Sequence, residues 1–482
     1  MRLMIARRVV QNIILICAAF IVMPVKGQLS RGPYLQSSSE SSITVRWRTL
    51  TATGSVVNYG TQVGNLNASA SGSGTTTEHV VMISGLQANT RYYYSIGDGT
   101  QVLASGSDFF FDTHPVVGAE TPTRIWILGD SGTSDANAEA VRDAFYSYNN
   151  NDTHTDLVLM LGDNAYDSGT DAEFQTAVFD MYPDTLKNTV LWSCFGNHDG
   201  VSADSSTQSG VYYDIFTFPT NGESGGVSSG TEAYFSFDYA NIHFVSLDSH
   251  ESPRGSAGAM ANWLRNDLAA TTQEWIIAFW HHPPYSKGSH DSDTDTRMTQ
   301  MRESFGPIMD QFGVDLIVSG HSHSYERSML IQGHYGLSTT FDSSMIVDGG
   351  NGSAGGDGTY VKEDLLSNNG AVYAVAGSSG KTSIRALDHP VMVSNYVELG
   401  SMVLDVSGNS LHAVFLNSQG LVLDDFDIQH GNASGVIALD VSVTDGNDDA
   451  EERASGSVNL DSTDLELVED PQVEPMPQTL GV

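Results

Sequence analysis

Five short motifs concentrate the residues of this chain that could do chemistry. They are Gly129-Asp130-Ser131-Gly132, Gly162-Asp163-Asn164-Ala165-Tyr166, Gly196-Asn197-His198-Asp199, His281-His282-Pro283-Pro284-Tyr285 and Gly320-His321-Ser322-His323. Their carboxylate, amide, phenol and imidazole groups can bind metals, and there are enough of them for two ions. Two ions about 3.5–4 Å apart can activate a water molecule and hold the oxygens of a phosphate group during displacement. Each motif alone is common as a turn or helix cap, so only the set of five indicates a site.

The motifs follow the expected strands of a mainly parallel sheet. Apolar runs that each end at one motif are found at 124–128, 156–161, 189–195, 274–280 and 314–319. Such continuous runs are typical of strands covered on both faces. Helical stretches lie between them, at 136–146, 171–181, 257–268 and 298–311, and a hairpin is expected at 234–248. Loops at the carboxyl ends of strands converge in an α/β domain, which would bring the motifs together.

The segment before these strands has a different pattern. From about residue 31 to 113, short alternating runs are separated by turn residues, which predicts a β-sandwich. Leu86-Gln87-Ala88-Asn89-Thr90-Arg91-Tyr92-Tyr93-Tyr94 resembles the leucine, turn and tyrosine segment of fibronectin type III domains, where a tyrosine ties a loop to a strand. We expect this domain at 28–115 and the α/β domain at 122–430.

The two ends of the chain differ from its middle. Residues 1–27 have the order of a secretory signal: three arginines precede an apolar run from Ile13 to Met23, and small residues precede Gln28. The run is shorter than the ~20 residues of a membrane-spanning helix, so we expect a secreted or periplasmic protein without a stable membrane anchor. The acidic, turn-rich residues 431–482 fit a disordered tail and an incomplete β-unit equally well.

The net charge and the cysteine content limit which partners the chain can bind and how its fold can be stabilised. The chain has 21 Lys and Arg against 58 Asp and Glu, a formal net charge of −37. This acidity argues against nucleic acid as a partner, and a phosphate substrate would need local positive charge such as metal ions supply. Cys194 is the single cysteine outside the expected signal, which excludes an internal disulfide in the processed chain.

The five motifs in this order resemble those of the metallophosphoesterase (calcineurin-like) superfamily and, within it, of the purple acid phosphatases. The resemblance covers roughly residues 124–429. It implies a multidomain fold: an N-terminal all-β fibronectin III-like sandwich, then an α/β domain built as a two-sheet sandwich flanked by helices. The distinguishing residue is Tyr166, three residues after Asp163, because the family uses such a tyrosine as a phenolate ligand to ferric iron. A packed aromatic is the alternative for Tyr166.

The resemblance also implies a ligand set for two metal ions. The first ion would be held by Asp130, Asp163, Tyr166 and His323. The second would be held by Asp163, Asn197, His281 and His321, so that Asp163 bridges the two. Fe(III) is expected at the first position and Zn(II), Mn(II) or Fe(II) at the second. His281 is preferred over His282 because of the family's His-x-Pro pattern, and His282 stays open as the alternative.

Two histidines would act on the substrate. His198, directly after Asn197, matches the family histidine that contacts the phosphate, and Asp199 is expected to orient it or to cap the next segment. His290, nine residues after His281, matches a histidine near the leaving group. An exposed loop position is the alternative for His290.

These residues predict a secreted binuclear metallohydrolase, acid phosphatase-like, that cleaves small phosphomonoesters by attack of a metal-bound hydroxide. A phosphodiesterase or nucleotide hydrolase on the same metal pair is the enzymatic alternative, because the pocket walls choose the substrate. A non-catalytic extracellular binding protein is a third interpretation. It would have a degenerate site, whereas none of the expected ligands is missing here.

Overall fold

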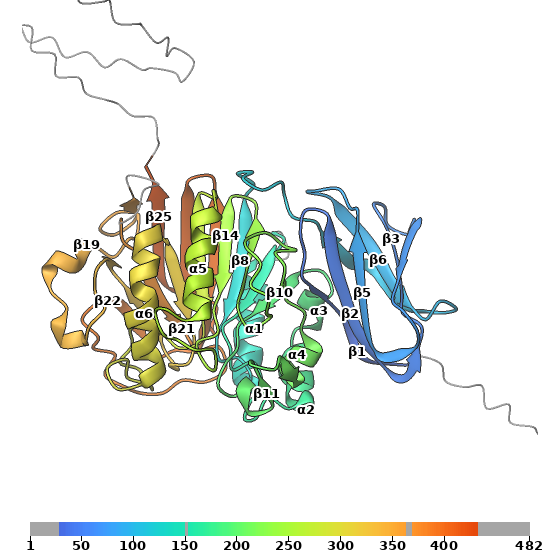
Figure 1. Ribbon diagram of the computed structural model, residues 1–482, viewed down its shortest axis with the longest axis horizontal. Coiled ribbons are helices and arrows are strands. Elements are labelled where there is room, and N and C mark those ends of the chain that lie inside the picture. Colours follow the sequence, from blue (N-terminus) through green and yellow to red (C-terminus); the bar gives the residue numbers. More distant parts are fainter. Residues whose placement is uncertain (1–27, 150–152, 363–368, 432–482) are drawn as a thin grey trace, which may run out of the picture. The chain divides into compact units, whose positions relative to one another are not determined.

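The computed structural model describes residues 28–149, 153–362 and 369–431 (Figure 1). The expected signal at 1–27 and all but the first residue of the expected acidic tail lie outside the described residues. Among the residues that are described, no helix is both long and apolar enough to cross a membrane.

Two mixed sheets form the α/β part of the chain. The ten-stranded sheet has the order β20-β25-β24-β23-β8-β9-β10-β1-β2-β5, and the seven-stranded sheet has the order β13-β14-β15-β16-β21-β17-β22. The parallel centre of the first is β8 (Thr123–Leu128), β9 (Leu157–Met160) and β10 (Val190–Ser193). The parallel centre of the second is β14 (Ile242–Ser246), β15 (Trp275–Trp280), β16 (Leu316–Ser319) and β21 (Val372–Ala376). The expected fold class, an all-β region followed by an α/β domain with two sheets, is confirmed.

The remaining elements complete these sheets and cover them. The other strands of the ten-stranded sheet are β1 (Leu29–Gln36), β2 (Ser42–Thr53), β5 (Thr76–Ser84), β20 (Tyr360–Lys362), β23 (Gly400–Ser407), β24 (Ser410–Asn417) and β25 (Val422–His430). Those of the seven-stranded sheet are β13 (Phe235–Tyr239), β17 (Tyr325–Ser328) and β22 (Met392–Tyr396). Two short pairs are β11 (Ala203–Asp204) with β12 (Ser209–Gly210), and β18 (Leu330–Ile331) with β19 (Ile346–Asp348). The α-helices are α1 (Ala136–Asn149), α2 (Asp171–Phe174), α3 (Pro183–Leu186), α4 (Val211–Ile215), α5 (Ala259–Ala270) and α6 (Thr296–Phe312).

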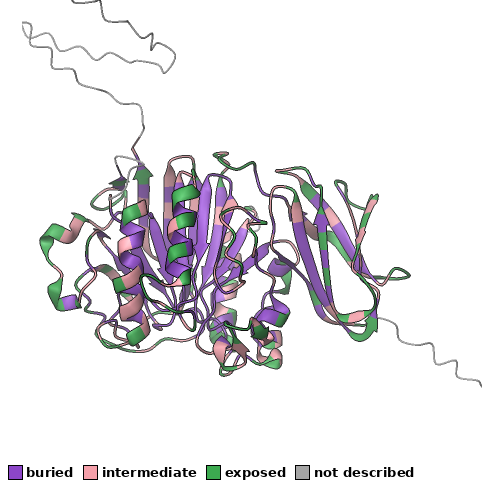
Figure 2. Ribbon diagram, in the orientation of Figure 1, coloured by how far each residue is buried: buried purple, intermediate pink, exposed green. Residues whose placement is uncertain are grey.

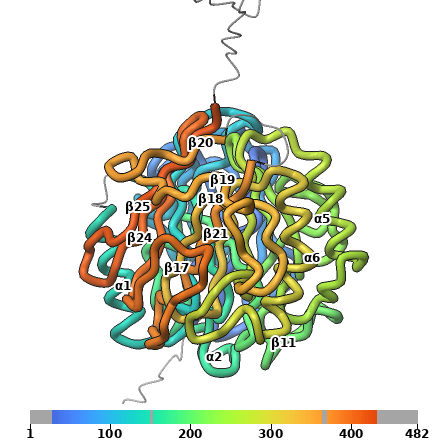
Figure 3. Tube along the Cα trace, turned by 90° about the vertical axis from the view of Figure 1, so that its left-hand side faces the viewer, coloured from blue at the N-terminus to red at the C-terminus, as the bar shows by residue number. Residues whose placement is uncertain are grey.

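The main core lies between the two sheets. Trp192 of β10 stacks on Phe237 of β13 with ring centroids 3.8 Å apart, and Phe237 in turn stacks on Phe244 of β14 at 4.7 Å. A second apolar cluster lies between the other face of the seven-stranded sheet and helices α5 and α6. The central parallel strands of the two sheets are therefore buried on both faces, whereas the helices expose their outer faces (Figure 2). Helices α5 and α6 lie on one side of the strands and α1 lies on the other (Figure 3).

One of the expected helices is shorter than its sequence pattern predicts. The segment 171–181 forms α2, which begins with a capping box between Thr170 and Glu173. The helix then widens into a π-helical turn over Gln175–Phe179. The long helices α1, α5 and α6 lie where they were expected. Asp295 caps the beginning of α6 and Gly313, with φ of 69°, ends it.

The N-terminal β region continues the ten-stranded sheet. Strand β1 pairs with β10 in parallel at Leu35 and Val190, which places β1, β2 and β5 at the edge of that sheet. A four-stranded sheet, β4 (Ala68–Ser71), β3 (Val56–Gly60), β6 (Arg91–Gly97) and β7 (Val102–Asp112), completes this region. The hydroxyl of Tyr92 accepts a hydrogen bond of 3.0 Å from the backbone N–H of Gln87, as in a tyrosine corner. The sequence did not predict that one sheet runs through both regions.

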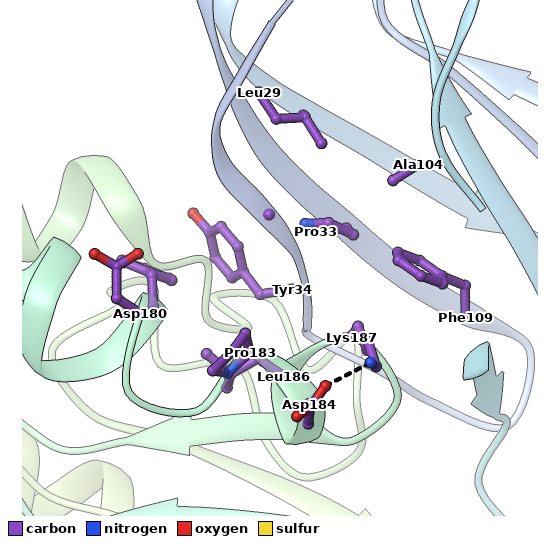
Figure 4. Close-up of a pocket in the computed structure, with 12 residues that line it drawn as sticks. Leu29, Pro33, Tyr34, Ala104, Phe109, Asp180, Pro183, Asp184, Leu186 and Lys187 are labelled. Atoms are coloured by element: carbon purple, nitrogen blue, oxygen red, sulfur yellow. Dashed lines mark hydrogen bonds and ion pairs between the residues drawn. The ribbon is translucent and has the colours of Figure 1, made fainter. Parts of the chain in front are cut away.

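A cavity of about 380 Å³ lies where the N-terminal strands meet the segment around α3 (Figure 4). Its walls combine apolar side chains with the ion-paired Lys187, whose ammonium lies 2.7 Å from Asp184. None of the residues expected to bind metal or substrate lines this cavity, so it is separate from the chemistry predicted above.

Candidate metal centre

Tight turns at the strand ends aim three of the expected ligands into one place. Asp130, Asp163 and His321 have left-handed backbones, with φ of 56°, 52° and 66°, and each directly follows a glycine. Non-glycine residues in this conformation are uncommon, and strained backbone of this kind clusters at functional sites. The turns after β8, β9 and β16 thus hold these side chains in a left-handed backbone conformation that few non-glycine residues adopt.

Two glycines make room for the carboxylates. A Cβ atom on Gly196 would lie 2.5 Å from Asp163 Oδ1, and one on Gly320 would lie 2.5 Å from Asp130 Oδ2. Both distances are shorter than a Cβ atom tolerates, so any larger residue would displace a carboxylate. The glycines of the third and fifth motifs therefore shape the site without offering a ligand.

Oxygen donors come from the loops of the ten-stranded sheet. Asp130 and Asp163 are buried, and the hydroxyl of Tyr166 lies 2.9 Å from Asp130 Oδ1 and 3.1 Å from Asp163 Oδ2. Burial, together with the two negative charges, raises the pKa of Tyr166 well above its ordinary value. A phenolate at this position therefore requires a neighbouring cation.

Nitrogen donors come from the loops of the seven-stranded sheet. His281 Nδ1 is 2.8 Å from the carbonyl oxygen of Leu161, which fixes the proton on Nδ1 and leaves Nε2 as a lone-pair donor. This Nε2 lies 3.1 Å from Asn197 Oδ1, 3.4 Å from Asp163 Oδ1 and 3.2 Å from His321 Nδ1. His323 Nε2 lies 3.5 Å from Asp130 Oδ1. All seven residues expected to be ligands thus meet at one place.

The donor set has the properties of a metal site. Asp130, Asp163 and His281 are all buried and offer ligand atoms within 4.8 Å of one another. His321 Nε2 is buried and has no hydrogen-bond partner among the described residues, and the nearest carboxylate oxygen, that of Asp295, is 3.7 Å away. Buried carboxylates and imidazole nitrogens that lie this close together are stable when a cation lies among them, so these residues fit the expected ions.

His282 lies close enough to compete with His281. It joins His281 and His321 in a second group of ligand atoms within 4.8 Å. Its Nδ1, however, lies 2.9 Å from the hydroxyl of Ser249, and burial lowers its pKa well below the ordinary value. The choice of His281 as the ligand therefore stays a prediction, which its contacts with Asn197 and Asp163 favour.

The two histidines expected to act on the substrate lie on the border of this centre. The backbone N–H of His198 donates to Asp163 Oδ1 at 2.8 Å, and the imidazole lies with its ring centroid 4.5 Å from that of Tyr166. His290 stacks on His321 at 3.7 Å, and burial and the charge of His323 lower its pKa. His290 is therefore packed against the site rather than extended into solvent.

Asp199 does not orient His198 as expected. Its Oδ2 accepts from the side chain of Asn164 at 2.9 Å and from the backbone N–H of Gly196 at 3.0 Å. Burial, followed by the charge of Asp163, raises the pKa of Asp199. This carboxylate joins the second and third motifs to each other, and the carbonyl of Asp167, 2.6 Å from His198 Nδ1, fixes the imidazole instead.

Two neighbours of the centre were missed in the sequence. Asp295 lies in the aspartate-rich run 291–295, where its approach to His321 has no local signal. Lys381 follows the polar run Gly377-Ser378-Ser379-Gly380, which reads as an ordinary loop. Its ammonium lies 3.5 Å from the centroid of the Tyr166 ring, a cation–π contact.

Comparisons with known proteins agree with this geometry. A family model described as calcineurin-like phosphoesterase matches residues 123–325, and one described as purple acid phosphatase, N-terminal domain, matches residues 31–113. Purple acid phosphatase 15 of Arabidopsis thaliana is 30% identical over 302 residues, which cover 57% of this chain and 53% of that protein. Purple acid phosphatase 1 of Ipomoea batatas is 28% identical over 264 residues, which cover 52% and 51%. The chain thus spans about half the length of these relatives.

A solved structure shares the fold. The purple acid phosphatase PPD1 from yellow lupin (Lupinus luteus) superposes with a TM-score of 0.63 at 17% identity, covering 83% of this chain and 75% of that one. At this identity the likeness concerns the fold alone. With both family models in their expected order and the ligand residues gathered at the strand ends, this chain combines a region that matches the purple acid phosphatase N-terminal domain with a region that matches the calcineurin-like phosphoesterases.

Proposed function

We propose that this chain is a binuclear metallohydrolase that cleaves phosphomonoesters. The observation that carries the proposal is the meeting of buried carboxylates, a phenol and imidazoles at the ends of five parallel strands, with Asp163 in contact with both groups of donors. The relatives named purple acid phosphatase support the same reaction. They match over about half their own length, so the activity of the whole protein is part of the proposal.

Two ions would be held by overlapping sets of residues. The first set is Asp130, Asp163, Tyr166 and His323, and the second is Asp163, Asn197, His281 and His321. Hard oxygen donors with a phenol favour Fe(III) in the first set, and the mixed donors of the second suit Zn(II), Mn(II) or Fe(II). When bound, such ions supply an activated water molecule and neutralise charge on the phosphate.

His198 and His290 would assist the departure of the alcohol. His198 Nδ1 faces the carbonyl oxygen of Asp167 at 2.6 Å, which leaves Nε2 for a hydrogen bond to the substrate. His290, held against His321 at 3.7 Å, lies where it can approach the leaving oxygen. A histidine that keeps one nitrogen fixed and the other free is suited to donate a proton or a hydrogen bond in the transition state.

The N-terminal pattern supports export of the protein. Residues 1–27 combine a basic beginning, an apolar run and small residues before Gln28. Mass spectrometry of protein recovered outside the producing cell should then find a chain that begins near Gln28. Recovery of the full-length chain from the cytoplasm alone would contradict export.

One combined experiment tests the proposed reaction. Purified protein should contain two metal ions per chain, show a visible absorption band and release p-nitrophenol faster from the mono-p-nitrophenyl than from the bis-p-nitrophenyl phosphate. Tyr166→Phe is the matched variant, because it removes the phenol oxygen and should remove the band. A clear preference for the diester would favour a phosphodiesterase, and a colourless wild-type protein that contains ferric iron would contradict the phenolate ligand.

A further inference from the structure

The loop 377–383 is fastened to the metal centre on both sides of Lys381. Two residues before it, the backbone N–H of Ser379 donates to the carbonyl oxygen of Gly129 at 3.0 Å. Two residues after it, the backbone N–H of Ser383 donates to the carbonyl oxygen of His323 at 3.0 Å. Gly129 and His323 belong to the first and fifth motifs, so the backbone of Lys381 is fixed relative to the expected ligands.

The side chain of Lys381 has no anionic partner within the described part of the chain. Its ammonium lies over the ring of Tyr166, 3.5 Å from the centroid, and the residue is only half-buried. Lys287, also in a loop near the site, offers a contrast, because its ammonium is neutralised by Asp291 at 2.6 Å and Asp293 at 2.8 Å. A protein with a net charge of −37 has ample carboxylates to pair with Lys381, yet this cation is left facing the site.

The position of this charge identifies what it can bind. The ammonium lies on the ring face of Tyr166, whereas the hydroxyl of Tyr166 points to Asp130 and Asp163. The transferred phosphate would sit at those carboxylates, where metal ions neutralise it. A cation beside that place, held by a rigid loop and open to solvent, is suited to a second anionic group on the same substrate.

We infer that Lys381 forms an anion subsite that receives a carboxylate or a further phosphate carried by the alcohol part of the phosphomonoester. The inference rests on the proposed function, because it specifies the class of substrate for that reaction. It makes this enzyme selective for phosphate esters with two separate anionic groups over esters of neutral alcohols.

The test compares esters that differ in one charge. The pair is 4-carboxyphenyl phosphate and its neutral isostere, 4-carbamoylphenyl phosphate, and 4-phosphonophenyl phosphate distinguishes a phosphate from a carboxylate as the second group. Lys381→Met should reduce the preference for each charged ester over the neutral ester by about 5-fold, because the variant loses one partly exposed ion pair with the substrate. The change should be mainly in KM. Lys381→Arg should restore most of the preference. Arg385→Met, which removes an exposed cation four residues further along the chain, should leave this preference unchanged.

Different failures have different meanings. An equal loss on charged and neutral esters would show that Lys381 contacts the transferred phosphate, and no loss on either would show that its role is structural. Both results would overturn the subsite. Calorimetric binding of the non-hydrolysable 4-carboxyphenylphosphonate and 4-carbamoylphenylphosphonate to the metal-loaded protein separates this inference from the proposed reaction. One outcome is that the wild-type chain cleaves no ester but binds the charged phosphonate more tightly than the neutral one, and that Lys381→Met removes this binding preference. That outcome would support the subsite and refute the proposed phosphatase reaction.

Discussion

The two sheets supply different halves of the metal centre. Loops after β8, β9 and β10 of the ten-stranded sheet carry carboxylate, phenol and amide oxygens, whereas loops after β15 and β16 of the seven-stranded sheet carry imidazoles. The oxygen half contains the negative charge, in Asp130 and Asp163, and both are buried. The nitrogen half carries no formal negative charge among its expected ligands.

This difference suggests that the halves have unequal influence on metal binding. A buried carboxylate without a neighbouring cation lowers the stability of the fold, so the two carboxylates on loops of the ten-stranded sheet favour metal binding. Neutral imidazoles would fill the remaining coordination positions and influence which metal ion is bound there. Loss of a shared oxygen donor should therefore disturb both ions, and loss of a single imidazole should disturb one.

The largest effect is expected from Asp163→Ala on the oxygen half. Asp163 contacts Tyr166 at 3.1 Å and His281 at 3.4 Å, so its removal takes a donor from both sets of ligands. Elemental analysis should find fewer than two ions per chain, and turnover should be abolished. Asp167→Ala removes an exposed carboxylate nearby and serves as the control. A variant of Asp163 that keeps two ions and full turnover would refute the bridging role.

On the nitrogen half, His281→Ala and His282→Ala form a matched pair. The Nε2 of His281 faces Asn197 at 3.1 Å, whereas His282 Nδ1 is engaged with Ser249 at 2.9 Å. His281→Ala should lose one ion and most of the activity, and His282→Ala should keep two ions. The assignment would have to be reversed if metal content fell in the second variant and not in the first.

A smaller loss is expected where a residue assists the reaction without binding metal. His198→Ala should lower the rate by roughly 10²–10⁴-fold if His198 donates to the substrate in the transition state. Metal content should stay at two ions, since the backbone N–H of His198 still donates to Asp163. His412→Ala, a remote and partly exposed imidazole, is the control. An unchanged rate with unchanged metal content would remove His198 from the mechanism.

The smallest expected effect is on folding stability and concerns a histidine outside the metal centre. There an imidazole lies between two carboxylates, and a proton takes the place of a metal ion. His243 of β14 is fully buried between Asp238 at 2.7 Å and Asp267 at 2.9 Å. Burial alone would lower its pKa, but the hydrogen bonds to these two carboxylates outweigh burial and raise it to about 9. Because the pKa is raised in the folded state, the stabilisation is fully present below the unfolded value of about 6.5 and is lost as pH rises through about 9.

Denaturant unfolding at several pH values measures this contribution. The free energy of unfolding of the wild-type chain should fall by up to about 3 kcal/mol between pH 6.5 and pH 9.5, relative to His243→Gln. A difference between the two proteins that does not depend on pH over this interval would show that His243 is not charged in the folded state.

Elements with strong local patterns could be predicted from the sequence. Strands β8, β9, β10, β15 and β16 are apolar on both faces, and a turn with a ligand follows each of them, so the place of the site was predictable before its geometry was known. The segment 171–181 was less predictable. Its apolar spacing favours one long helix, yet the helix widens into a π-helical turn over Gln175–Phe179, for which the local sequence carries no signal.

Other parts of the site depend on contacts between distant segments. Lys381 meets Tyr166 across more than two hundred residues of sequence, and nothing in the polar run before it distinguishes it from a solvent-exposed loop. Asp295 is one of several aspartates in a row, and only the fold shows which of them approaches His321. Local patterns determine elements, whereas these side chains acquire their roles from the packing of two sheets.

The pairing of β1 with β10 has a consequence for the evolution of the chain. The two regions that match separate family models share one sheet, and Gln36 adds a hydrogen bond of 2.6 Å to the carbonyl oxygen of Leu191. Excision of residues 28–115 would leave β10 as an uncovered edge, the kind of surface at which chains aggregate. A chimera with a different N-terminal region would have to supply strands that continue the sheet from β10 as β1, β2 and β5 do. Recombination would therefore tend to pass on the two regions together, as one inherited piece.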